Sequence, residues 1–138
     1  MTDLPPITPF LLVVDVANVV GAVPDGWWRD RAGAAARLRE ALTPLAAAGL
    51  PEIDAPGPID VALVVEGQAR EVPGTPTVPV IPAESNGDDT IVELVSAEAP
   101  ERDRIVVVTA DRELRRRVEA AGAETLGPRT LLDALDRK

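Results

Sequence analysis

The chain has no cysteine and no histidine, and only three of its 138 residues are aromatic. Disulfides, thiol nucleophiles, the usual zinc ligands and mechanisms that need an imidazole base are therefore excluded, which leaves chemistry based on oxygen ligands. The N-terminal segment MTDLPPITPF lacks the basic and apolar regions of a signal peptide, and no apolar run approaches the length of a membrane span. We therefore expect a cytoplasmic protein without a membrane partner.

Basic residues are also few, and they are unevenly placed. The net charge of -9 and the pI near 4.5 argue against tight, charge-driven binding of bulk nucleic acid. Residues 51–100 contain ten acids and a single basic residue, Arg70, whereas arginines are concentrated over residues 102–117. An acidic segment beside an arginine cluster suits a phosphate-bearing substrate bridged by a metal ion, with Arg112 as a candidate contact. A solvated helix face is the commoner reason for arginines on a helix.

The rest of the composition is that of a globular protein. Hydrophobic residues make up 46% and charged residues 27%, which predicts one domain spanning residues 1–138. Apolar runs predict buried strands at 7–15, 59–65 and 104–110, an edge strand at 77–81 and a short strand at 123–126. Helical spacing predicts helices at 29–48, 90–99, 112–121 and 129–136, with residues 16–26 as a loop and Pro44 kinking or splitting the first helix.

Strands separated by helices imply right-handed crossovers and a mostly parallel sheet covered on both faces, which is an α/β sandwich. In such a sheet, ligands bind beyond the carboxyl ends of the strands. Asp15, Glu66 and Asp111 each follow an apolar strand, and Asp88 and Asp89 begin a helix. The sequence therefore predicts an acidic cluster at one end of the sheet.

Ionised carboxylates beside an apolar core are costly unless positive charge compensates them. An arginine or a helix N-terminus can do so for one acid, whereas a shared divalent cation explains several at once. Taken singly, Asp88 and Asp111 stand where helix N-caps stand, so capping explains each of them at least as well. Asp15 directly follows Leu-Leu-Val-Val with no helix pattern for several residues, which makes capping a poor explanation for it.

Three segments occur in order along the chain: Val13–Gly21 (VVDVANVVG), Gly87–Ile91 (GDDTI) and Val107–Leu114 (VVTADREL). Together they resemble, in order and spacing, the NYN branch of the PIN-like ribonuclease superfamily, and the similarity covers the chain from about Ile7 to the last helix. The resemblance implies a Rossmann-like three-layer α/β/α sandwich with a mostly parallel sheet of about five strands. It also implies an acidic pocket that binds Mg²⁺ or Mn²⁺ and cuts RNA phosphodiester bonds.

Carried over by position, the resemblance gives a predicted catalytic set of Asp15, Asn18, Asp88, Asp89 and Asp111. Asp15, Asp89 and Asp111 are the expected metal ligands, and Asn18 is expected to position the substrate or a metal-bound water. Carboxylate and amide oxygens are ligands that Mg²⁺ accepts, and acids gathered without a metal should have raised pKa values. The family usually has glycine directly after the first aspartate, whereas this chain has Val16, so the backbone there cannot adopt a conformation that only glycine allows.

Trp27 and Trp28 are adjacent and lie in the loop after the first segment. Trp28 is a candidate for stacking on a flipped-out RNA base. The stronger explanation for at least one of the pair is that it staples the following helix to the core.

Two other functions remain open. The same acidic metal site would serve a nucleotide phosphohydrolase or pyrophosphohydrolase, which the acidic surface favours. A non-catalytic RNA-binding module with this fold is consistent with Val16 and with the absence of a recognised base. In each case RNA or a nucleotide is the expected partner, and a homodimer through the alanine-rich helix at 29–48 is a further option.

Overall fold

Five strands form one parallel sheet in the computed structural model, which describes residues 8–23, 26 and 29–136. The strands are β1 (Phe10–Asp15), β4 (Asp60–Val65), β5 (Val80–Pro82), β6 (Arg104–Val108) and β7 (Glu124–Leu126). Their order across the sheet is β5-β4-β1-β6-β7, and every neighbouring pair is parallel. The predicted parallel sheet of five strands is confirmed, and β5 lies at its edge, where the prolines around it are tolerated.

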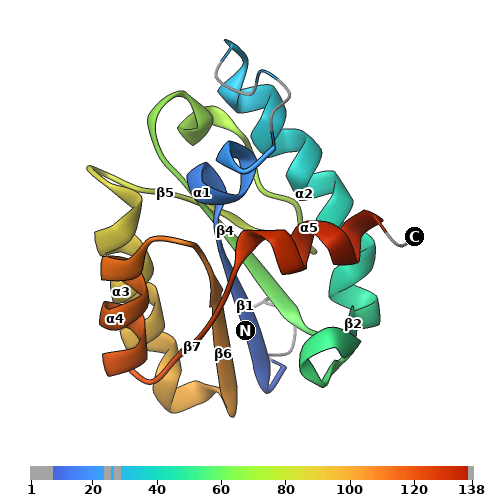
Figure 1. Cartoon of the computed structure of the whole chain (residues 1–138), viewed down its shortest axis with the longest axis vertical. Helices are drawn as coiled ribbons and strands as arrows, with labels where there is room; N and C mark the ends of the chain where they lie inside the picture. The colour runs from blue at the N-terminus through green and yellow to red at the C-terminus, as the bar shows by residue number, and fades with distance from the viewer. Residues whose placement is uncertain (1–7, 24–25, 27–28, 137–138) are drawn as a thin grey trace, which may run out of the picture.

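Helices cover both faces of this sheet, so the predicted three-layer sandwich is confirmed. They are α1 (Val16–Gly21), α2 (Arg31–Ala48), α3 (Gly87–Glu98), α4 (Arg112–Ala120) and α5 (Pro128–Asp136). Figure 1 shows α3 and α4 on one face and α1, α2 and α5 on the other. A small hairpin of β2 (Gly49–Leu50) and β3 (Ala55–Pro56) and three 3₁₀ turns, at Pro51–Ile53, Gly67–Glu71 and Ala99–Glu101, complete the described elements.

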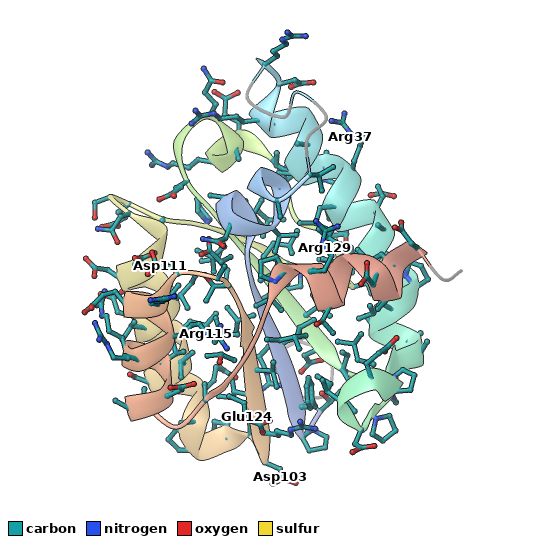
Figure 2. The ribbon with its side chains drawn as sticks, viewed as in Figure 1. Arg37, Asp103, Asp111, Arg115, Glu124 and Arg129 are labelled. Atoms are coloured by element: carbon teal, nitrogen blue, oxygen red, sulfur yellow. The ribbon has the colours of Figure 1, made fainter. Side chains whose placement is uncertain are left out.

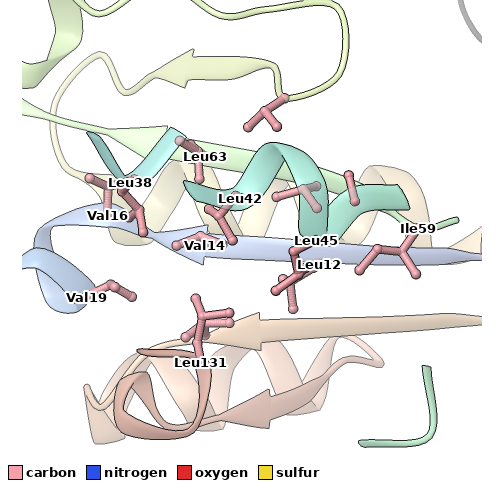
Figure 3. Packing of buried hydrophobic residues seen from close by; sticks show 14 of the residues in the cluster. Leu12, Val14, Val16, Val19, Leu38, Leu42, Leu45, Ile59, Leu63 and Leu131 are labelled. Carbon is pink, nitrogen blue, oxygen red and sulfur yellow. The ribbon is translucent and has the colours of Figure 1, made fainter. Parts of the chain in front are cut away.

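The core consists of two layers that share the central strand β1. Leu12 and Val14 pack among residues of α1, α2 and α5, as Figure 3 shows, whereas Leu11 and Val13 pack among residues of α3 and α4. Successive side chains of a strand point to opposite faces, so a strand that is apolar throughout supplies both layers. This is why the continuous apolar run predicted a central strand correctly.

Two local expectations differ from the structure. Residues 16–21 form the short helix α1 rather than a loop, with Val16 and Val19 buried in the core. Three of its six residues are valine, and helices this short are not stable alone, so packing rather than local preference holds it. Pro44, expected to kink or split the helix, does not split it, because α2 continues through this exposed proline as one helix. The ring therefore costs α2 one backbone hydrogen bond without ending it.

The order of the strands reverses at β1. The chain moves from β1 to β4 and β5 on one side of the sheet, and then crosses to β6 and β7 on the other. The crevice at the carboxyl ends of β1 and β6 is therefore the switch point where ligands bind in sheets of this kind. Asp15 is the last residue of β1 and stands at that point. Within the described ranges, no helix is both long and apolar enough to cross a membrane.

Candidate active site

Asp15 is a buried carboxylate at the switch point, with only 6% of its surface exposed. The hydroxyl of Thr109, which is fully buried just beyond β6, donates a hydrogen bond of 2.9 Å to Asp15 Oδ2. The same hydroxyl oxygen accepts the backbone N–H of Asp111 at 3.2 Å. Thr109 therefore joins the acid that ends β1 to the backbone of the acid that follows β6.

Asn18 lies on α1 and connects the same two segments from the other side. Its Oδ1 accepts the backbone N–H of Ala110 at 2.9 Å. This contact fixes α1 against the loop that leads from β6 into α4. The oxygen of Asn18 is thus used within the protein, and its amide N–H groups donate to none of the residues that the structure describes.

Asp111 is the N-cap of α4, because its Oδ1 accepts the backbone N–H of Leu114 at 3.0 Å. The capping explanation that the sequence offered for Asp111 is therefore confirmed. Its Oδ2 makes no hydrogen bond, and Asp111 makes no ion pair, with any residue that the structure describes. Figure 2 shows Asp111 at the upper end of the sheet and Asp103, which precedes β6, at the lower end. Capping one helix thus leaves half of this carboxylate available to a ligand.

Asp88 and Asp89 lie in the first turn of α3, and they face different partners. Asn86 caps this helix by accepting the backbone N–H of Asp89 at 2.9 Å, so the capping explanation for Asp88 is wrong. The carboxylate of Asp89 is exposed and forms an ion pair of 2.9 Å with Arg117 of α4. It also accepts the side-chain amide of Asn86. Asp88 is half-buried and makes neither contact.

The acids at this edge act on one another electrostatically. Burial raises the pKa of Asp15 from 3.8 to about 6, and the charges of Asp88 and Glu66 add to the rise, against the hydroxyl of Thr109 and the backbone of Asn18. Burial also raises the pKa of Asp88, together with the charges of Asp111 and Glu66, against the opposing effect of Arg117. The expected rise in pKa is therefore present at Asp15 and Asp88. By contrast, Arg117 and Asn86 lower the pKa of Asp89.

The predicted convergence is observed for four of the acids, Asp15, Glu66, Asp88 and Asp111. Glu66 follows β4 and accepts the backbone N–H of Gly87 at 2.8 Å, which ties the first turn of α3 to this edge. Arg112 is the exposed first residue of α4, directly after Asp111. Trp27 and Trp28 lie outside the described residues.

Sequence reasoning assigned no role to Thr109 or Arg117. The role of Thr109 could have been predicted from the sequence, because its hydroxyl lies between an apolar strand and an aspartate. A polar group buried there must find hydrogen-bond partners. The role of Arg117 could not have been predicted, because it is one of several arginines on α4 and only the packing of α4 on α3 brings it to Asp89. The contact between α3 and α4 is a tertiary contact, and the spacing of residues along the chain does not predict it.

The donor set at this edge fits a hard divalent cation, because it offers carboxylate oxygens and no nitrogen or sulfur ligands. Among the residues described, no three acidic side chains form a ready-made metal-binding group. Mg²⁺ is usually held by one or two protein carboxylates, with waters and substrate phosphates as the other ligands. A site of that kind therefore needs fewer protein ligands than a ready-made group of three acids.

The strand order, the helices on both faces and the acidic edge define a doubly wound parallel α/β protein with its candidate site at the switch point. Two crystal structures of Rae1 (YacP) from Bacillus subtilis share this fold. The structure of a Rae1 mutant matches with a TM-score of 0.72 and 20% identity, over 92% of this chain and 75% of that chain. A second Rae1 structure matches with a TM-score of 0.70 and 21% identity, over 92% of this chain and 74% of that chain. At this identity the similarity concerns the fold alone. No family model and no curated protein matches the sequence.

Proposed function

We propose that this protein is a divalent-metal-dependent ribonuclease that hydrolyses RNA phosphodiester bonds at the edge formed by Asp15, Asp88 and Asp111. The observation that carries the proposal is the burial of Asp15 at the switch point, beside other acids and without an ion pair to any described residue. A protein gains no stability from such an arrangement, because each charge raises the cost of the next. Groups held at a cost in this way are typical of functional sites.

The roles of the residues follow from their contacts. Asp15 and Asp88 would hold Mg²⁺ or Mn²⁺, and the free Oδ2 of Asp111 would complete the set directly or through a water. Thr109 positions Asp15, and Asn18 presents its amide N–H groups to the substrate or to a water. Arg112, the exposed first residue of α4, would contact a substrate phosphate. The resemblance predicted Asp89 as a metal ligand. Asp89 would instead link α3 to α4 through its ion pair with Arg117.

A bound divalent cation would lower the pKa of a water and offset the negative charge that builds on the phosphate. The carboxylates that would hold the cation would also orient a water toward phosphorus and accept one of its protons, so that a new P–O bond would form while the bond to the leaving oxygen breaks. The leaving oxygen takes up a proton, and the products are a phosphate monoester and a hydroxyl. The chain contains no histidine to serve as a base, so the site must work through carboxylates and water.

Turnover of a labelled single-stranded RNA with Mg²⁺ or Mn²⁺ tests the proposal. Asp15→Asn and Asp111→Asn should each lower kcat at least about a hundredfold, because each removes charge that must meet the metal or its waters. Asp103→Asn is the matched control, since Asp103 is exposed at the opposite end of the sheet. Full activity in both site variants, with folding verified by circular dichroism, would refute the proposal.

A nucleotide phosphohydrolase is the second candidate, and the net charge of -9 favours it, because a long RNA is repelled more strongly than a small nucleotide. The two are separated by comparing turnover of RNA with turnover of nucleoside triphosphates at the same metal concentration. Turnover of triphosphates alone would select the second candidate. Failure to bind Mn²⁺ or turn over either substrate would leave a non-catalytic module.

A further inference from the structure

A groove of about 370 Å³ lies between α1, α2 and α5, on the sheet face opposite α3 and α4. Its apolar wall is formed by aliphatic side chains of all three helices, among them Val19, Val20, Leu38, Leu132 and Leu135. Its charged members are Arg37, Arg129 and Asp136. Small-molecule sites are concave and mostly apolar with a few polar groups, and the volume of this groove lies within their usual range.

The two arginines of the groove differ from five of the twelve arginines that the structure describes. Arg39, Arg102, Arg104, Arg116 and Arg117 each form an ion pair with an acid. Arg37 and Arg129 are exposed and form no ion pair with the described residues, although the chain carries nine more acids than bases. Figure 2 shows them on neighbouring helices, α2 and α5, on the same side of the molecule. Two unpaired guanidinium groups over an apolar wall are complementary to an anion with an apolar part.

The groove and the acidic edge share the helix α1. Asp15 directly precedes α1, and Asn18 contacts Ala110 at the acidic edge. Val19 and Val20, the next residues on α1, line the groove. An α-helix with its side chains is about 10 Å across, so a short stretch of extended single-stranded RNA is long enough to pass from the acidic edge to the groove.

We propose that this groove binds a nucleotide of the RNA strand outside the bond that is cut, with the base and sugar on the aliphatic wall and phosphates at Arg37 and Arg129. The proposal rests on the proposed ribonuclease function and adds the place where the substrate is held. Guanidinium groups suit phosphate because they bind it through two N–H groups at once. Asp136 opposes the phosphate and so limits the affinity.

Fluorescence anisotropy with an RNA of about eight nucleotides tests this directly, in an Asp15→Asn background so that the strand is not cut. The double variant Arg37→Gln, Arg129→Gln should raise the Kd roughly tenfold. Loss of two phosphate contacts on a single strand should also reduce the slope of log K against log salt by about 1.4. Asp136→Asn should tighten binding. Arg116→Gln is the matched control, because Arg116 is exposed and paired with Glu113 on α4, away from the groove.

Turnover distinguishes the groove from the catalytic edge. In protein with Asp15 intact, the double variant should raise the KM for the long RNA and leave turnover of a dinucleotide unchanged, since a dinucleotide is too short to occupy both sites. Equal RNA binding by the double variant and by Arg116→Gln would overturn the proposal that the groove binds a nucleotide, while leaving the ribonuclease proposal in place. No RNA binding by any of these proteins would overturn both. A dimer in light scattering that the double variant dissociates would identify the groove as a contact between copies and overturn the nucleotide site.

Discussion

At the scale of single residues, the site depends on one buried hydroxyl. Thr109 donates to Asp15 and accepts from the backbone of Asp111, so both hydrogen-bonding roles of the hydroxyl are used to hold two acids in register. Asp15 forms no ion pair with a described residue. Only the hydrogen bonds from Thr109 and from the backbone of Asn18 stabilise its charged form. The acids Asp15, Asp88 and Asp111 are therefore held at one edge although none of them forms an ion pair with a residue that the structure describes.

This arrangement predicts that Asp15→Asn stabilises the fold in metal-free buffer at neutral pH. The pKa of Asp15 is raised from 3.8 to about 6 in the folded state, so the folded form binds the proton more tightly than the unfolded form. Stability then falls as pH rises from about 4 to about 6 and stays low above that. Asparagine carries no charge, so the variant should gain on the order of 2 to 3 kcal/mol over the wild type at pH 7.5 and much less near pH 4.

Urea unfolding with EDTA at pH 4.5 and 7.5 measures this difference. Asp103→Asn serves again as the control, since Asp103 is exposed and its replacement should change stability equally at both pH values. A stability difference for Asp15→Asn that is no larger at pH 7.5 than at pH 4.5 would contradict a raised pKa.

At the scale of elements, continuous apolar runs predicted the central strands well because both faces of β1, β4 and β6 are covered. The sequence did not predict α1, since its valines are poor helix formers and only the burial of Val16 and Val19 selects a helix there. It also could not separate Asp88 from Asp89, because two adjacent acids look alike until α4 packs against α3 and Arg117 reaches one of them.

Packing of α4 on α3 therefore predicts unequal roles for these neighbours. Asp88→Asn should lower kcat at least about a hundredfold and weaken Mn²⁺ binding, because the carboxylate of Asp88 interacts electrostatically with the other acids of the site. Asp89→Asn should change kcat within about threefold, because an exposed ion pair contributes little. Steady-state kinetics over a Mn²⁺ titration compares the two variants directly. An equal loss in Asp89→Asn would show that Arg117 releases Asp89 to the site during turnover.

At the scale of the whole molecule, the site exists because of the strand order. The predicted alternation of strands and helices implied that acids following the strands share one edge, and this much followed from the sequence. Which strands are neighbours did not, because nothing local in Asp15 or Thr109 specifies that β1 pairs with β6. That pairing brings the two residues, 94 positions apart, within a hydrogen bond.

Because β1 is the central strand, a ligand at its end should stabilise the entire fold. A cation that neutralises the acids around Asp15 binds the folded state alone, since these acids are brought together only by the sheet. At a metal concentration a hundred times the Kd, the gain is about 2.7 kcal/mol, which corresponds to a rise in Tm of roughly 5 to 10 °C. Differential scanning fluorimetry with MnCl₂ or MgCl₂ against EDTA measures it at pH 7.5. Asp103→Asn should keep the full rise and Asp15→Asn should lose most of it, whereas an unchanged rise in Asp15→Asn would place the cation elsewhere on this acidic protein.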